Sequence, residues 1–121
     1  MSSTPMEVVS SKKIGTHDGS FHCDEALACF MLQQTAEFSQ AAIVRSRDPK
    51  VLDTLDIVVD VGAVYEPAKH RYDHHQRGFA ETLSHKHTMK LSSAGLVYKS
   101  VHTQSHQARH LTVHSCMLIV A

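Results

Sequence analysis

Histidine and carboxylate side chains recur in three short segments of this chain. The first segment holds His17, His22 and Asp24, the second is Asp60, and the third is the triplet 73–75, Asp-His-His. Eleven of the 121 residues are histidine, whose ring binds metals and transfers protons near neutral pH. A set of imidazole and carboxylate donors suits Mn, Zn or Fe rather than Ca. The three segments therefore predict a transition-metal site.

Such a set of donors could hold two divalent ions, most simply with one carboxylate bridging them. Two ions roughly 3.5 to 4 Å apart clamp a phosphoryl group, lower the pKa of a bound water and stabilise the leaving oxygen. Taken singly, a strand-end Asp is more often a turn former and a His more often a surface or core residue. The joint occurrence of seven such residues indicates a metallophosphoesterase.

The elements between these segments alternate between strand and helix. The expected strands are residues 12–16, 42–45, 57–59 and the extended segment 70–75, and the expected helices are 24–35, 49–55 and 92–101. Asp48 with Pro49, and Ser92 or Ser93, are typical helix starts. This order predicts an α/β fold with an open, mostly parallel sheet and flanking helices. In such sheets ligands bind at the carboxyl ends of the strands, where the three segments fall.

Composition narrows the class of protein. The length fits one domain, and 42% hydrophobic with 20% charged residues is typical of a globular chain. A formal charge of zero excludes an overall basic field for nucleic acid or an anionic membrane. No apolar run is long enough to cross a bilayer. Three cysteines without a CxxC pair indicate a reducing compartment, and Cys23 is expected to be a small buried filler.

The two ends of the chain differ from its centre. Residues 1–11 are polar and expected to be disordered, residues 12–101 form the predicted lobe, and residues 102–121 are expected to be a divergent tail. The N-terminus has no apolar segment and no Arg, so neither a secretory signal nor a mitochondrial presequence is visible. Nucleus or cytoplasm is therefore the location expected from the sequence.

Five blocks of the sequence resemble the MYG exonuclease family, which is related to the DHH phosphoesterases. In chain order the blocks are GTHDGSFHCDEALA, IVRSRDP, DIVVDVG, HRYDHHQRGF and KLSSAGLVY. The resemblance covers residues 13–98, a part of what the family contains, so a truncated N-terminal lobe of DHH-phosphoesterase type is expected. It implies a metal-dependent 3′-5′ RNA exonuclease of nucleus and mitochondrion that acts in RNA processing. RNA is therefore the implied partner, and the oligomeric state stays open.

The resemblance also implies roles for single residues. One ion would be held by His17, His22 and Asp60, and the other by Asp24, Asp60 and His74, with Asp60 bridging. Asp73 would orient the site and His75 would face the phosphate. His22 departs from the pattern of the wider DHH superfamily in two ways. The superfamily usually has a carboxylate at this position, and its spacing from the residue that corresponds to His17 is one residue shorter. The implied ions are Mn²⁺, with Mg²⁺, Zn²⁺ or Co²⁺ as alternatives.

Several cations flank the metal segments. Arg47 and Arg77, with Arg45, Arg71 and the neutral Gln76, could hold substrate phosphates, the arginines through forked hydrogen bonds. For the arginines the alternative is solvated surface charge. Tyr72 and Phe79 are expected to pack in the core rather than to stack on a base.

Three functional alternatives remain open at this point. The chain could be a nuclease lobe, weakened or inactive in truncated form. It could instead be an inactive module that binds metal or RNA, or a truncated isoform without a function of its own. Pyrophosphate or a dinucleotide is an alternative substrate, since the same metal clamp would serve either.

Overall fold

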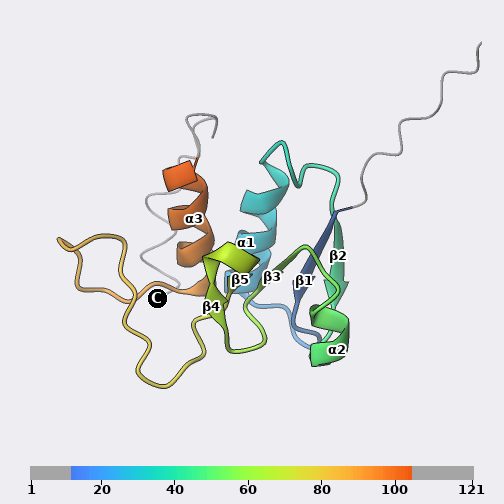
Figure 1. Cartoon of the computed structure of the whole chain (residues 1–121), viewed down its shortest axis with the longest axis horizontal. Helices are drawn as coiled ribbons and strands as arrows, with labels where there is room; N and C mark the ends of the chain where they lie inside the picture. Colours follow the sequence, from blue (N-terminus) through green and yellow to red (C-terminus); the bar gives the residue numbers. More distant parts are fainter. Residues whose placement is uncertain (1–11, 105–121) are drawn as a thin grey trace, which may run out of the picture.

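The computed structural model describes residues 12–104, and a five-stranded sheet forms the centre of this part (Figure 1). Its strands lie in the order β2-β1-β3-β5-β4. They are β1 (Lys13–Thr16), β2 (Ala42–Arg45), β3 (Ile57–Val59), β4 (Tyr65–Glu66) and β5 (Arg71–Tyr72). All neighbours pair in parallel except β4 and β5. The predicted α/β fold with a mostly parallel sheet is confirmed.

The helices begin where capping residues allow. They are α1 (Cys23–Gln33), α2 (Pro49–Leu52) and α3 (Ser93–Gln104), with a 3₁₀ turn, η1 (Pro67–Lys69). The Asp48 carboxylate accepts a hydrogen bond from the Lys50 N–H at 3.0 Å, and the Ser92 hydroxyl accepts one from the Gly95 N–H at 3.2 Å. Both satisfy backbone donors that a first helical turn leaves free. None of the helices in residues 12–104 is long and apolar enough to cross a membrane.

Two hydrophobic layers lie on opposite faces of the sheet. Successive side chains of a strand point to opposite faces, so Ile57 and Val59 of β3 pack under α1 and α3, whereas Val58 packs against α2. The first layer also contains Ile14, Met31 and Leu96, and the second is the smaller cluster around Leu52 and Leu55. Figure 1 shows α1 and α3 side by side and α2 away from them. The site described below lies at the carboxyl ends of strands held between these layers.

Beyond shifts of one to three residues at the ends of α1 and α3, the structure differs from the sequence prediction at three places. The helix expected over 49–55 ends at Leu52 and continues as hydrogen-bonded turns to Leu55. The extended segment 70–75 contains only the two-residue β5, and β4 was not predicted at all. Strands this short carry no readable alternation, because period-2 patterns need about four residues. The expected disorder of residues 1–11 and most of the tail at 102–121 lie outside the described residues.

Gly15 in β1 packs tightly against the layer of side chains around α2. A Cβ atom at this position would lie 2.5 Å from Leu55 Cδ1 and 3.3 Å from Val58 Cγ2. We expect Gly15→Val to lower the free energy of unfolding by about 2–3 kcal/mol, since overpacking forces neighbours off their rotamers. Urea unfolding measures this change. Ala42→Val, at an exposed position of β2, is the control, and an equal effect of both variants would contradict the expectation.

Candidate metal centre

Three neighbouring parallel strands carry the predicted site residues at their carboxyl ends. His17 follows β1, Asp60 follows β3, and the triplet 73–75 follows β5. Their side chains line a cleft of about 640 Å³, together with the side chains of two neighbouring loops. The lining residues are His17, His22, Asp24, Arg47, Asp60, Val61, Gly62, Ala63, Asp73, His74 and His75.

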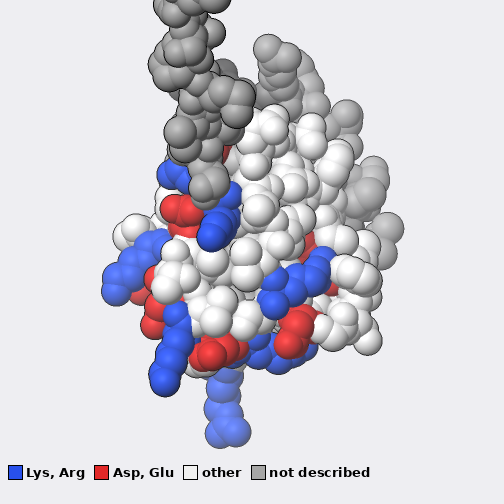
Figure 2. Space-filling model, turned by 90° about the vertical axis from the view of Figure 1, so that its right-hand side faces the viewer, with Lys and Arg blue, Asp and Glu red and all other residues white. Residues whose placement is uncertain are grey.

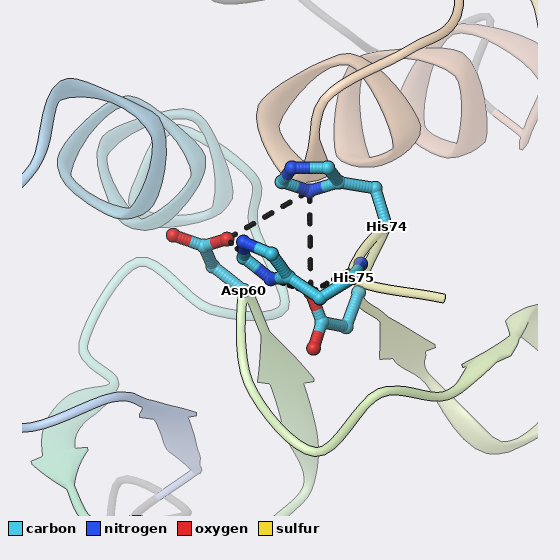
Figure 3. Close-up of side chains that lie close together, drawn as sticks. Asp60, His74 and His75 are labelled. Carbon is cyan, nitrogen blue, oxygen red and sulfur yellow. Dashed lines mark hydrogen bonds and ion pairs between the residues drawn. The ribbon is translucent and has the colours of Figure 1, made fainter. Parts of the chain in front are cut away.

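Asp60 contacts His17 on one side and His74 and His75 on the other, and Figure 3 shows the side with His74 and His75. Its Oδ2 lies 3.3 Å from His17 Nε2. Its Oδ1 lies 3.8 Å from His74 Nδ1 and 3.6 Å from His75 Nδ1. The residue is buried and has a φ of +58°, a left-handed conformation that Asp and Asn adopt more readily than most residues. The backbone thus turns sharply at the strand end and directs the carboxylate inward.

His17 shows that these residues fit a metal ion. Its Nδ1 lies 3.1 Å from the Asp18 carbonyl oxygen, which places the ring proton on Nδ1 and the lone pair on Nε2. This buried Nε2 has no hydrogen-bond partner, and buried polar atoms without a partner are rare in proteins. Two donors bound to one ion at about 2.1 Å lie about 3.0–3.5 Å apart. The distance from His17 Nε2 to Asp60 Oδ2 falls in that range.

The triplet after β5 forms the other wall of the cleft. Asp73 is buried, accepts a hydrogen bond from the Ala63 N–H at 2.7 Å, and contacts His75 Nδ1 at 2.6 Å. Within the described residues, one ligand atom from each of Asp60, Asp73, His74 and His75 lies within 4.8 Å of the others. Asp73 and His75 are thus close enough to offer donors themselves, and the division of roles implied by the resemblance stays a prediction.

Asp24 and Ser93 connect the site to the start of α3. The Asp24 carboxylate accepts hydrogen bonds from the Ser93 N–H at 3.2 Å and the Ala94 N–H at 2.7 Å. The Ser93 hydroxyl lies 3.2 Å from Asp60 Oδ1 and 2.9 Å from His74 Nδ1. The sequence indicated Ser93 only as a possible helix cap. Its contact with the site arises because α3 begins beside α1.

Glu25 is a second site residue that the sequence analysis missed. Its side chain is fully buried, and its Oε1 accepts a hydrogen bond from the His22 N–H at 2.6 Å. The same oxygen lies 3.5 Å from Arg45 Nη1 and 3.7 Å from His17 Nε2. From the sequence, an acidic residue in the first turn of a helix indicates only a favourable interaction with the helix dipole. Glu25 contacts both ends of the loop that carries His17 and His22.

The remaining predicted residues lie at different depths. His22 is exposed, lines the cleft, and has its ring centroid 5.2 Å from that of His17. Arg47 lines the cleft and pairs with Asp18 at 2.8 Å. Arg77 is exposed and does not line the cleft. Their roles as ligand and substrate contacts stay predictions.

The structure also tests the roles expected for Cys23, Tyr72 and Arg71. Cys23 is exposed, so its expected role as a buried filler is wrong: it is the first residue of α1 and is not among the buried residues of that helix. Tyr72 is buried, as expected, and its hydroxyl contacts Ser100 Oγ at 2.8 Å. Arg71 donates to the Leu52 and Leu55 carbonyl oxygens, which fixes the end of α2 instead of facing the cleft.

Burial shifts the proton affinity of two of these groups. Burial, together with the neighbouring Asp24 carboxylate, raises the pKa of Asp60 to about 6. Burial and the adjacent His75 lower the pKa of His74. The Asp60 carboxylate is therefore held where negative charge is unfavourable, and His74 is held neutral, as a metal ligand must be.

The raised pKa of Asp60 predicts that the affinity for metal decreases as the pH is lowered. Below about pH 6 a proton occupies the carboxylate that an ion needs, so the affinity for Mn²⁺ should fall by about tenfold for each further pH unit through Asp60 alone. Above pH 7 this dependence should disappear. Calorimetric titration with Mn²⁺ between pH 5 and 8 measures the effect, and an affinity unchanged over the whole range would contradict it.

The chain matches a known protein family over a region that includes the residues of the cleft. Residues 13–117 match the family MYG1_exonuc, described as an uncharacterised protein family (UPF0160). The chain belongs to this MYG1 exonuclease family. The resemblance seen in the five sequence blocks is thus confirmed, and the matched region contains every residue of the cleft. The match extends beyond residue 102, while the divergence of the tail stays a prediction.

Relatives from animals and fungi are similar over most of this chain. A human protein named MYG1 exonuclease is 55% identical over 97 residues, which are 76% of this chain and 26% of the relative. A Schizosaccharomyces pombe protein named MYG1 protein C694.04c is 60% identical over 87 residues, 72% of this chain and 26% of the relative. The chain thus spans about a quarter of the length of these relatives. No solved structure matches it significantly.

Proposed function

We propose that this chain binds two divalent metal ions in the cleft and forms the metal-binding lobe of a phosphodiesterase. The observation that carries the proposal is the placement of Asp60, whose two carboxylate oxygens face different histidines. A bridging carboxylate requires this arrangement. The ions would be Mn²⁺, with Mg²⁺, Zn²⁺ or Co²⁺ as alternatives, and when bound they would activate water and stabilise charge on a phosphoryl group.

Two groups of ligands would hold the ions. His17, His22 and Asp60 would hold one, and Asp24, Asp60 and His74 the other. The lone pair on buried His17 Nε2 and the neutral state of His74, favoured by its lowered pKa, support this assignment. Asp73 would keep His75 oriented toward a phosphate through their 2.6 Å contact.

The proposed substrate is the 3′ end of RNA. Support comes from membership of a family whose human relative is named an exonuclease, and from the resemblance of the sequence blocks. The chain has no net charge, and on the face seen in Figure 2 the Lys and Arg side chains lie among Asp and Glu. Long-range attraction of a polyanion is therefore weak, and binding would depend on the cleft itself. Nucleus and mitochondrion are the proposed locations.

We further propose that this 121-residue chain is by itself a weak or inactive nuclease. The second ion would have three proposed ligands, Asp24, Asp60 and His74, and it would share Asp60 with the first ion. The chain spans about a quarter of the length of its relatives, and with so few ligands the occupancy of the second ion would be low. Phosphodiester hydrolysis by two ions requires both to be bound.

The test combines metal binding with an RNA assay. Wild type should bind close to two Mn²⁺ ions, the second weakly, and should melt at a higher temperature with Mn²⁺ than without. His74→Ala should lose the weaker ion, whereas His85→Ala, at an exposed position outside the cleft, should bind as wild type does. Absence of Mn²⁺ binding by wild type would overturn the metal-centre proposal.

The RNA assay uses single-stranded RNA labelled at its 5′ end, so that shortening from the 3′ end is visible. Wild type should give little or no product, and any product should disappear with a chelator and in His74→Ala. Rapid shortening by wild type would contradict the proposed weak activity. Hydrolysis of pyrophosphate or a dinucleotide, but not of RNA, would replace the proposed substrate.

A further inference from the structure

The loop between β1 and α1 exposes an aromatic ring beside the metal centre. Phe21 is 74% exposed, a large value for a residue that can bury its side chain. It directly precedes His22 and lies four residues after His17, and both histidines line the cleft. Phe21 does not itself line the cleft, so only a ligand that extends from the cleft along this loop would reach its ring.

The Arg45 guanidinium packs against one face of the Phe21 ring. Its guanidinium carbon lies 4.2 Å from the centroid of Phe21, a stacked arrangement in which the cation is attracted by the electron-rich face of the ring. Arg45 also donates to the His17 carbonyl oxygen at 3.2 Å and lies 3.5 Å from Glu25 Oε1. One face of the ring is therefore held by a side chain that is itself anchored in the site.

Arg47 holds the other part of the loop. Its Nε donates to Asp18 Oδ1 at 2.8 Å and its Nη2 to the Asp18 carbonyl oxygen at 3.3 Å. Arg45 is the last residue of β2, which pairs with β1, and Arg47 lies two residues beyond its end. The loop is thus fixed along its length by two arginines, and Phe21 is presented on a supported loop.

We propose that Phe21, backed by Arg45, is a stacking platform for the nucleobase next to the phosphate in the cleft. This inference rests on the proposed function, because it requires a nucleotide substrate. Aromatic rings bind bases of any sequence, since every base offers a π face. The Arg45 guanidinium restricts the motion of the Phe21 ring and covers one of its faces. The opposite face stays available to stack on a base. A base on Phe21 would place its phosphate toward the loop's histidines and Arg47.

The charge distribution gives a reason for such a platform. The chain lacks a net positive charge, and its acidic and basic side chains are interspersed on the face shown in Figure 2. Proteins that bind single strands combine a basic groove with aromatic stacking. Because the interspersed charges form little of a basic groove, stacking would supply a large part of the binding free energy. It would also distinguish nucleotides from free phosphate or pyrophosphate, which have no base.

The chain contains no tryptophan, which permits a direct test. In Phe21→Trp the introduced indole is the sole tryptophan, and stacking of a base should quench its fluorescence. With Mn²⁺ present, adenosine 5′-monophosphate should reduce the emission at least about twofold with saturation below about 10 mM. Ribose 5-phosphate, which has no base, should leave the emission unchanged.

Phe30→Trp is the matched control, because Phe30 is also exposed, at 54%, but lies within α1 and not on the loop that carries His17 and His22. Saturable quenching in Phe21→Trp alone supports the platform, and Phe21→Ala should then bind the nucleotide at least about fivefold more weakly than wild type. Equal quenching of both tryptophan variants, or none in either, overturns it. Mn²⁺ binding in these samples separates this failure from failure of the metal centre itself.

Discussion

Replacing Asp60 with Asn is expected to abolish binding of the more tightly held Mn²⁺ ion and to stabilise the metal-free protein. The amide is a poor metal ligand and cannot bridge two ions. Since losing a residue that only supports a ligand costs about 10- to 100-fold in affinity, we expect loss of the ligand itself to lower Mn²⁺ affinity by at least about 100-fold. Asn tolerates the φ of +58° at this position. The backbone at the end of β3 should therefore keep its shape.

The gain in stability follows from the raised pKa of Asp60. The folded state holds the proton up to about pH 6, whereas an unfolded carboxyl releases it near 3.8. Between these values the folded state binds more protons, so the free energy of unfolding decreases as pH rises and stays low above pH 6. Asn carries no charge, and its amide can donate to the unpartnered His17 Nε2. At pH 7.5 the variant should gain about 1–3 kcal/mol.

Thermal melting with and without Mn²⁺ at pH 4.5 and pH 7.5 separates these effects. Without metal, the melting temperature of Asp60→Asn should be higher than that of wild type at pH 7.5, and most of this difference should disappear at pH 4.5. Addition of Mn²⁺ should raise the melting temperature of wild type only. Asp53→Asn, at an exposed position after α2, should behave as wild type. A lower melting temperature of metal-free Asp60→Asn at pH 7.5 would show that the carboxylate is stabilising, contrary to this account.

Glu25→Ala is expected to destabilise the protein more than any exposed charge substitution. The carboxylate is fully buried and contacts the His22 N–H, Arg45 and His17. Truncation removes the acceptor of the His22 N–H and one partner of the Arg45 guanidinium, and it opens a cavity at the start of α1. Losing one partner of a buried pair is costly, and we expect a loss of about 3 kcal/mol.

Urea unfolding of three variants tests this expectation. Glu25→Gln retains an oxygen that can accept from the His22 N–H, so its loss should be smaller, at about 1 kcal/mol. Glu37→Ala removes an exposed partner of Lys12 at 3.3 Å and should change stability by less than about 0.5 kcal/mol. Equal effects of the Glu25→Ala and Glu37→Ala substitutions would mean that the buried carboxylate makes no net contribution.

Local patterns in the sequence predicted the elements that position the site. The β-branched run at 57–59 predicted a buried strand, and the Asp48-Pro49 and Ser92-Ser93 pairs predicted helix starts that the structure contains. These signals work because capping and side-chain alternation act over a few residues. The two-residue strands β4 and β5 leave too short a pattern, and only their pairing with each other and with β3 defines them.

The sequence by itself determined which residue types stand at the ends of three strands, and with them the class of chemistry. The parallel order of β1, β3 and β5 then places His17, Asp60 and His74 at one edge, as expected for such a sheet. Only the tertiary structure decided that Asp60 divides its oxygens between histidines, that Asp24 is bound by Ser93 and Ala94, and that Glu25 is buried. These contacts join residues up to 70 positions apart, and they depend on how α1 and α3 pack, which no local pattern encodes.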